Sequence, residues 1–272
     1  MQKQNLNLIN ILNFTFSSKN NFNVLIKKIL IRIFDLKTYF YKNKNLILLK
    51  KNSVNMNIFL NSLNLKLTKE SVNVSKLIKK KSLKIIKKTR YDLGGSANLV
   101  LLYFITRFFK PKFILETGVA AGFSSYAFLK AIKKNKKGIL YSSDLPYFRI
   151  KNPKKYIGIV VPEFLKKNCW HLYTEGDTAN IDSIRKKVKS FDLIHYDSDK
   201  SYLGRYFFFK NIQSMINKNT IIIMDDLHNN IFFFDYIRKN KITNYKIIEN
   251  NNSFVGLIFL NSKNVNILDN FT

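Results

Sequence analysis

From residue 97 onward, short apolar runs alternate with longer segments in which apolar residues recur at helical spacing. Runs of this kind predict buried strands, and the 3.6-residue period predicts amphipathic helices. The expected strands span residues 112–116, 138–144, 170–174, 191–197, 220–225, 245–249 and 254–260. The expected helices span residues 97–109, 124–134, 163–168, 181–189, 202–217 and 229–240. This alternation predicts a doubly wound, Rossmann-like α/β domain with a seven-stranded, mostly parallel sheet and a terminal antiparallel strand.

The first 90 residues have a different character, since they are rich in Asn and Lys and contain neither Gly nor Pro. Helical spacing is present over residues 22–41 and 69–88, whereas residues 45–67 give no clear assignment. The buried face of the second segment is expected to consist of Val72, Val74, Leu77, Leu83, Ile85 and Ile86. We therefore expect an N-terminal basic helical extension, residues 1–90, followed by an α/β domain, residues 91–272.

The chain has a formal net charge of +30, from 47 Lys and Arg against 17 Asp and Glu. Such a charge is typical of nucleic-acid-binding proteins. Here Lys far outnumbers Arg, although Arg is the preferred reader of phosphates and bases, so a Lys-rich solvated surface is the simpler interpretation. A single cysteine, Cys169, excludes a disulfide framework and fits a reducing compartment. No apolar run reaches a membrane-spanning length, and we expect a cytoplasmic protein.

The strand at 112–116 leads through a glycine loop into a helix. Glu116 ends the strand, and Gly118 and Gly122 bound the loop. Glycine permits backbone conformations and close approaches to a ligand that a Cβ would forbid. The spacing G-x-x-x-G differs from the dinucleotide pattern G-x-G-x-x-G, and an acid at residue 116 would repel a pyrophosphate. The stretch resembles motif I of the class I S-adenosylmethionine-dependent methyltransferases, and the resemblance extends over residues 91–260.

This resemblance implies that S-adenosylmethionine is the cofactor. It implies that Gly118 and Gly122 pass the methionine part, that Glu116 lies near its amino group, and that Asp144 accepts hydrogen bonds from the ribose hydroxyls. Asp177 matches the polar group near the adenine, although a helix N-cap is an equally good interpretation of this residue. The other loop residues expected to contact the cofactor are Ala120 and Ser124.

Carboxylates also follow two later strands, as Asp197 and Asp199 in one case and Asp225 and Asp226 in the other. Ligands of open α/β sheets bind at the carboxyl ends of the strands. Several hard oxygen ligands at one place suit Mg²⁺, and without a cation they would repel one another. The two acidic pairs resemble those of the metal-dependent O-methyltransferases, both the catechol and caffeoyl-CoA type and the macrocin/noviose sugar type.

The phrases around these acids are also similar to those of bacterial methyltransferases found with surface-glycan genes, in which His usually stands at the position of Lys200. By resemblance, the metal ligands are Asp197, Asp225 and Asp226. Asp199 and Lys200 are alternative general bases, with a surface ion pair or a charge at a helix N-terminus as the structural alternative. His228 is a candidate for contact with the acceptor, or else bonds to backbone, whereas His195 is expected to be structural. The Asp225–Asp226 pair has a helix cap as its alternative role.

These features predict an S-adenosylmethionine-dependent O-methyltransferase that acts on a hydroxyl of a sugar or small diol with the help of a divalent metal. The alternative is an RNA methyltransferase or a basic nucleic-acid-binding protein, but Asp197 begins a sequence unlike the Asn-Pro-Pro-Tyr type used for amino methylation. Because residues 1–90 offer no usable acids, they are expected to be dispensable for cofactor binding and to serve acceptor recognition or assembly into a homo-oligomer. The acceptor itself is not predicted.

Overall fold

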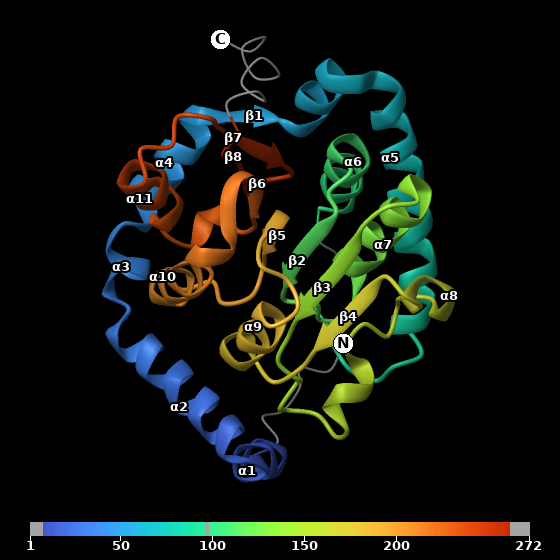
Figure 1. Ribbon diagram of the computed structural model, residues 1–272. Coiled ribbons are helices and arrows are strands. Elements are labelled where there is room, and N and C mark those ends of the chain that lie inside the picture. The colour runs from blue at the N-terminus through green and yellow to red at the C-terminus, as the bar shows by residue number, and fades with distance from the viewer. Residues whose placement is uncertain (1–7, 96–97, 262–272) are drawn as a thin grey trace.

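The computed structural model describes residues 8–95 and 98–261. Its centre is an eight-stranded sheet with the order β1-β7-β8-β6-β5-β2-β3-β4 (Figure 1). The strands are β1 (Ser53–Asn55), β2 (Phe113–Thr117), β3 (Ile139–Ser143), β4 (Trp170–Tyr173), β5 (Phe191–Tyr196), β6 (Ile216–Met224), β7 (Tyr245–Asn250) and β8 (Ser253–Phe259). All neighbours pair in parallel except β8, which is antiparallel to both β6 and β7. The expected doubly wound, mostly parallel sheet is confirmed.

The expected count of seven strands is wrong, because the N-terminal region adds a strand of its own. Strand β1 pairs in parallel with β7, with Ser53 opposite Ile247. The Ser53 hydroxyl donates a hydrogen bond of 3.0 Å to Glu249 Oε2 at the same edge. Three residues with a single apolar side chain carry no strand signal, so this pairing depends on tertiary contact rather than on local pattern.

The helices are α1 (Leu8–Phe16), α2 (Lys19–Phe34), α3 (Leu36–Phe40), α4 (Lys42–Asn52), α5 (Met56–Ile86), α6 (Leu99–Phe109), α7 (Phe123–Asn135), α8 (Glu163–Lys166), α9 (Asp177–Arg185), α10 (Tyr202–Asn211) and α11 (Phe232–Lys239). The expected helix start at Ala97 lies outside the described residues. The helix expected to reach residue 217 ends at Asn211, because β6 already begins at Ile216. Helix α9 starts four residues earlier than expected, after Gly176 with φ of +86°.

The sheet is covered on both faces, and alternate strand residues enter different cores. On β2, Ile114 joins the core formed with α5, α6 and α7, whereas Leu115 joins the core formed with α9, α10 and α11. Both side chains are fully buried. This alternation is the period of two expected for strands, and here both faces are apolar because helices cover each of them.

Helix α5 packs along α6 and α7, and Val74, Ile85 and Ile86 of the expected face contact the core, but two other expected positions do not. Leu77 and Leu83 are exposed, and the buried side instead carries Ser71, Ser75 and Ser82. The hydroxyl of Ser75 donates a hydrogen bond to the backbone oxygen of Ser71. Small side chains let two helices approach closely, so the expected face from Val72 to Ile86 is wrong in these two positions.

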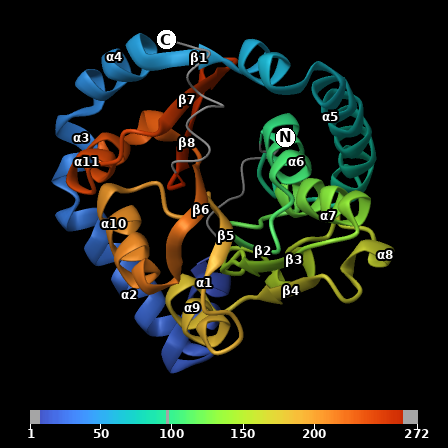
Figure 2. The same ribbon diagram turned by 45° about the horizontal axis from the view of Figure 1, so that its top comes forward.

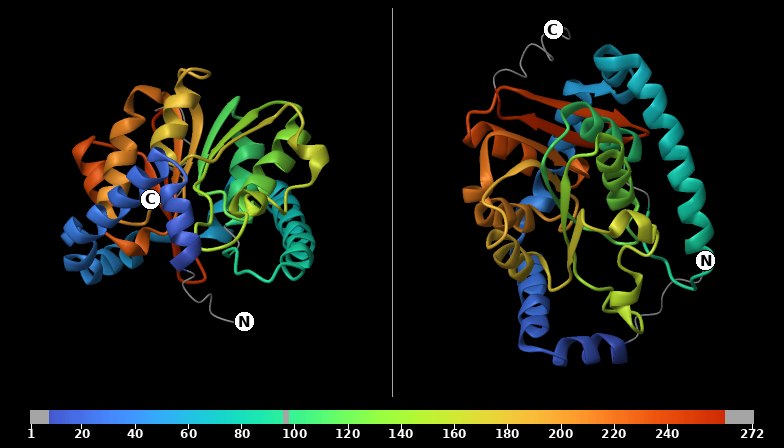
Figure 3. Two further views of the ribbon diagram at one scale, coloured as in Figure 1. Left: turned by 90° about the horizontal axis from the view of Figure 1, so that it is seen from below. Right: turned by 45° about the vertical axis from the view of Figure 1, so that its right-hand side comes forward.

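The N-terminal region runs around the sheet rather than lying to one side of it. Helices α1 to α4 follow one flank, β1 joins the sheet edge beside β7, and α5 returns along the opposite flank (Figure 2). The view from below shows the blue helices of this region beside the orange helices, with the teal helix α5 on the opposite side of the molecule (Figure 3). Among the residues described, none of the helices combines the length and apolar character needed to cross a membrane.

Candidate active site

The glycine loop between β2 and α7 is held against the end of β5. The Gly118 amide donates to the Ser143 oxygen at 2.9 Å, and Gly118 has φ of +79°. A Cβ at residue 118 would lie 2.3 Å from the backbone oxygen of Asp197. Glycine is therefore required at residue 118 for two reasons, its positive φ and the closeness of the Asp197 backbone at the end of β5.

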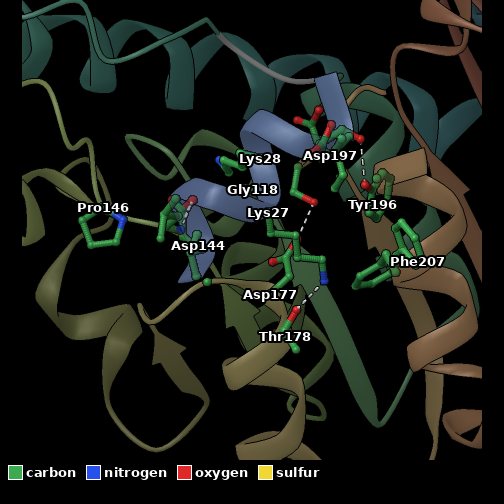
Figure 4. Close-up of a pocket in the computed structure, with 18 of the residues that line it drawn as sticks. Lys27, Lys28, Gly118, Asp144, Pro146, Asp177, Thr178, Tyr196, Asp197 and Phe207 are labelled. Carbon is green, nitrogen blue, oxygen red and sulfur yellow. Dashed lines mark hydrogen bonds between the residues drawn. The ribbon is translucent and has the colours of Figure 1, made fainter. Parts of the chain in front are cut away.

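A cavity of about 530 Å³ opens beside this loop. Figure 4 shows side chains from several strand ends directed toward it. Four residues predicted to bind cofactor line this cavity: Gly118, Ala120, Asp144 and Asp177. Its remaining walls come from α10, from the segment after β3 and from α2. The cavity thus lies at the carboxyl ends of the strands, where open α/β sheets bind ligands.

Asp144 is fixed at the end of β3 by two backbone amides. Its Oδ2 accepts from the Ala120 amide at 2.7 Å and its Oδ1 from the Leu145 amide at 2.8 Å. Burial raises the pKa of Asp144 to about 7, with smaller increases from Asp177 and Glu116, while the two amide hydrogen bonds act to lower it. Each oxygen keeps a lone pair for a second donor, as two ribose hydroxyls would require.

Asp177 also points into the cavity. It accepts hydrogen bonds from Ser143 Oγ at 2.6 Å and from Ser198 Oγ at 2.7 Å. Burial raises the pKa of Asp177, although both serine hydroxyls oppose the shift. The N-cap of α9 is Gly176 rather than Asp177, so the helix-cap interpretation is wrong. Neither serine stands out in the sequence, because no motif singles out their partnership with this acid.

Glu116, Gly122 and Ser124 lie outside the lining of this cavity. The Glu116 carboxylate is fully buried, and its Oε2 accepts from Ser125 Oγ and Ser142 Oγ, both at 2.6 Å. A Cβ at residue 122 would lie 2.7 Å from the Cα of Gly158, so this glycine meets protein rather than the cavity. Glu116 and Gly122 therefore contact neighbouring protein segments rather than the cavity.

The acids after β5 and β6 meet around the ammonium group of Lys200. Its Nζ lies 3.0 Å from Asp226 Oδ2 and also forms an ion pair with Asp197 Oδ1. Burial lowers the pKa of Lys200, while Asp226 and Asp225 oppose this effect. The arrangement brings together three of the predicted residues and places a positive charge between two of the carboxylates.

His195, which is expected to be structural, lies next to this cluster. Its imidazole is fully buried, and its Nε2 lies 3.6 Å from Asp225 Oδ2. Neither ring nitrogen has a hydrogen-bond partner among the described residues. Burial acts to raise the pKa of Asp225, but His195 and Lys200 outweigh it and hold the pKa below its ordinary value. The available signal in the sequence is that His195 lies only two residues before Asp197, at the end of β5.

One ligand atom from each of His195, Asp197 and Asp225 lies within 4.8 Å of the others, so these residues could hold a metal ion. Asp226, a predicted ligand, is not in this group of three. Its backbone has a φ of +52°, and its carboxylate contacts Lys200. Its backbone oxygen accepts from the buried Arg205 at 2.8 Å. The Asp226 residue is thus the N-cap of a short 3₁₀ turn without a side-chain capping bond.

Asp199 and His228, the other predicted catalytic residues, are separated from this cluster in different ways. Asp199 lines the cavity beside the glycine loop, and its Oδ1 accepts hydrogen bonds from the amide and hydroxyl of Ser201 at 2.9 and 2.6 Å. His228 lies in the 3₁₀ turn Leu227–Asn229, which packs against α4, and it lines neither this cavity nor the next.

A second cavity, of about 730 Å³, adjoins the first. Asp225 and Asp226 lie on one wall, and Lys76 and Lys79 of α5 lie on another. Gly95 and Asp197 line both cavities. The carboxylate cluster therefore stands between a space at the glycine loop and a space toward the N-terminal region.

The expectation that the N-terminal region is dispensable for cofactor binding disagrees with this geometry. Val24, Lys27, Lys28 and Ile31 of α2 line the cavity at the glycine loop. Lys27 Nζ donates to Thr178 Oγ1 at 3.2 Å (Figure 4). The absence of acids did not indicate this wall, because it is built from lysine and aliphatic side chains.

The chain is similar to known proteins in part of its sequence and in its fold. Residues 115–227 match the family model of a methyltransferase domain. A search of the curated proteins finds no match. Among solved structures, a candidate caffeoyl-CoA O-methyltransferase from Staphylococcus aureus is similar at 14% identity and a TM-score of 0.53, covering 71% of this chain and 98% of that one.

Two further structures show the same likeness. The O-methyltransferase TomG from Streptomyces achromogenes, involved in tomaymycin synthesis and solved with S-adenosylmethionine, has 14% identity and a TM-score of 0.51, covering 70% of this chain and 96% of that one. An O-methyltransferase from Bacillus cereus, solved with S-adenosylhomocysteine, has 14% identity and a TM-score of 0.50, covering 71% and 90%. The chain therefore shares the fold of these O-methyltransferases, and residues 115–227 of that fold match a methyltransferase domain.

Proposed function

We propose that this chain transfers the methyl group of S-adenosylmethionine to a hydroxyl oxygen of a small acceptor, a sugar or another diol. The observation that carries the proposal is that two cavities meet at Asp197. One contains the glycine loop and Asp144, which suit the methyl donor. The other contains Asp225 and Asp226, whose oxygens suit an acceptor with neighbouring hydroxyls. Holding both reactants at one junction supplies the proximity that methyl transfer needs.

In this reaction the acceptor oxygen attacks the methyl carbon in line, the carbon–sulfur bond breaks, and the sulfur leaves as a thioether. The acceptor hydroxyl also loses a proton. We assign this role to Lys200 rather than to Asp199. Lys200 lines neither cavity, but its Nζ contacts Asp197, which lines both, and Asp226, which lines the acceptor side, whereas Asp199 lines only the donor side. Asp144 and Asp177 hold the donor, and Asp197 orients the acceptor at the junction.

The residues present also fit a divalent metal. The group formed by His195, Asp197 and Asp225 offers one imidazole and two carboxylates within 4.8 Å, and the imidazole nitrogens have no other partner in the described ranges. A mixed set of this kind suits Mn²⁺, Fe²⁺ or Zn²⁺ at least as well as the Mg²⁺ suggested by carboxylates alone. When bound, such an ion would supply positive charge that lowers the pKa of the acceptor hydroxyl.

The proposal is tested by offering methyl-labelled S-adenosylmethionine and a panel of nucleotide sugars, free sugars, catechols and RNA to the purified protein. We expect the label on a hydroxyl oxygen of a sugar or diol, located by mass spectrometry. Labelling of RNA, or of an acceptor nitrogen, would overturn the proposed acceptor class while leaving the methyl donor unchanged.

The metal is tested separately with two neighbouring substitutions. We expect Asp225→Asn to weaken Mn²⁺ binding, measured by calorimetry, and to lower the transfer rate, each by about tenfold or more, because it removes one charged ligand. Asp226→Asn is the matched control and should change Mn²⁺ affinity by less than about threefold, since the Asp226 carboxylate lies outside the ligand group. Equal effects of both substitutions on Mn²⁺ affinity would contradict this assignment.

The raised pKa of Asp144 makes a prediction about cofactor affinity. The ionised carboxylate is the form that accepts from both ribose hydroxyls, and with a pKa of about 7 it becomes protonated as the pH falls below neutrality. We expect the affinity for S-adenosylmethionine to fall about tenfold between pH 8 and pH 6, because each pH unit below the pKa costs one factor of ten.

The control for this pH effect is Asp144→Asn, measured by calorimetry over the same range. This variant should bind more weakly at pH 8 and should lose most of the pH dependence, because its amide does not titrate. A variant with the same pH dependence as the unmodified protein would assign the effect to another group.

A further inference from the structure

Helix α2 has an inner face that lines a cavity and an outer face that exposes apolar side chains. Its inner face lines the cofactor-side cavity through Val24, Lys27, Lys28 and Ile31. The exposed apolar residues Phe22, Ile26, Ile29, Leu30 and Ile33 recur at helical spacing. Ile33 is 61% exposed and Ile29 is 50% exposed. An apolar stripe on the outer side of a surface helix reverses the usual arrangement, in which such a stripe faces the core.

The apolar surface continues on the neighbouring helices. We refer to α1–α4, residues 8–52, as the N-terminal belt. Its further exposed apolar side chains are Leu8, Ile9, Leu12, Phe16, Phe34, Leu36, Tyr39, Phe40, Tyr41, Leu46 and Ile47. Soluble proteins rarely expose apolar patches that extend over several elements, and such patches mark surfaces that bind a protein or a membrane.

The charge of the belt distinguishes between these two partners. Residues 8–52 contain nine Lys and Arg and a single acid, Asp35. That acid is only 2% exposed, and it accepts hydrogen bonds from Thr38 and from the Leu203 amide. The belt therefore presents cations and apolar groups to its surroundings but no exposed carboxylate. A second copy of this chain would bring like charges together, whereas an anionic surface would complement them.

We propose that the N-terminal belt docks on an anionic phospholipid membrane surface. An amphipathic helix with Phe, Leu and Ile on one side and Lys and Arg nearby lies in the interfacial plane, with its apolar side in the region between headgroups and acyl chains. Lys19, Arg32 and Lys42 of the belt would interact with the acidic headgroups. Since α2 also lines the cofactor-side cavity, one helix would connect the docking surface with the methyl donor. The proposal does not depend on the acceptor.

The experiment is sedimentation of the full chain with vesicles of phosphatidylcholine alone and with vesicles that also contain phosphatidylglycerol. We expect binding to the anionic vesicles that weakens as salt is raised. Ile26→Ser/Ile29→Ser/Ile33→Ser should lower the partition coefficient by about tenfold or more, because it removes the apolar stripe. The matched control, Leu65→Ser/Leu77→Ser/Leu83→Ser on α5, removes three apolar residues of similar exposure and should change binding by less than about twofold.

A second variant, Lys19→Glu/Arg32→Glu/Lys42→Glu, tests charge without altering the apolar stripe, and it should also lower the partition coefficient for anionic vesicles by about tenfold or more. Thermal unfolding of each variant confirms that it folds. Several results would overturn the proposal: no binding to either kind of vesicle, equal binding to both, or unchanged binding of both belt variants. A wild-type dimer that the Ile→Ser variant converts to a monomer, without vesicle binding, would assign the belt to contact between copies of the chain.

Discussion

Replacement of Gly118 by Ala is expected to weaken the binding of S-adenosylmethionine by at least about 100-fold. The new Cβ would lie 2.3 Å from the oxygen and 2.7 Å from the carbon of the Asp197 backbone. Backbone cannot rotate away as a flexible side chain can, and φ of +79° is itself strained for alanine. The glycine loop would have to leave its position beside β5 and would displace the cavity wall that holds the donor.

The control for this substitution is Gly95→Ala. Gly95 lines the same cavity, but a Cβ at this position meets no atom within 4 Å and its φ lies outside the left-handed range. Calorimetry should show an affinity within about threefold of the unmodified protein for Gly95→Ala. If Gly118→Ala also binds S-adenosylmethionine within this range, the close approach of the loop to β5 is not needed for the donor.

Replacement of Lys200 by Met is expected to reduce kcat for methyl transfer by about 10²–10⁴-fold, the usual contribution of a general base. Met keeps the length and apolar stem of the side chain but cannot accept a proton. The affinity for S-adenosylmethionine should change by less than about threefold, because Lys200 lies outside the lining of the donor cavity. Single-turnover rates with the labelled acceptor measure the chemical step directly.

Two further variants test whether Lys200 acts as a general base or only as a positive charge that positions Asp197 and Asp226. Lys200→Arg keeps the charge but does not deprotonate in the accessible pH range, so a base role predicts no rescue. Lys79→Met is the matched control, since Lys79 lines the acceptor-side cavity but, among the described residues, forms no ion pair with these acids. Recovery of most of the rate by Lys200→Arg would make Lys200 a positioning residue.

Most strands could be predicted because they are buried on both faces and therefore contain apolar runs, such as residues 221–224 of β6. Strand β1 could not, because Ser53–Asn55 has no such run and its partner β7 lies far along the chain. The face of α5 was misjudged for a related reason. Close packing of helices favours the small Ser71, Ser75 and Ser82, which an apolar pattern does not mark.

In the candidate site, too, some residues could be predicted from the sequence and others could not. Gly118, Asp144 and Asp197 follow strands directly, so the topology of a parallel sheet brings them to one edge whatever the details of packing. His195 reaches the site from within a strand, where a buried histidine usually has only a structural role. The contribution of Lys27 depends on how α2 folds back across 151 residues to meet Thr178, a contact that local sequence does not encode.

The pairing of β1 with β7 has a consequence for how the chain reaches its native state. Its register places Ser53 opposite Ile247, so β1 cannot pair with β7 until the chain has been synthesised as far as β7. Contacts of such long sequence separation form slowly, because loop-closure entropy must be lost before they contribute. Until then, the belt and α5 flank an unfinished sheet. The nascent chain therefore carries exposed apolar surface for an extended period, a condition in which folding intermediates aggregate or need a chaperone.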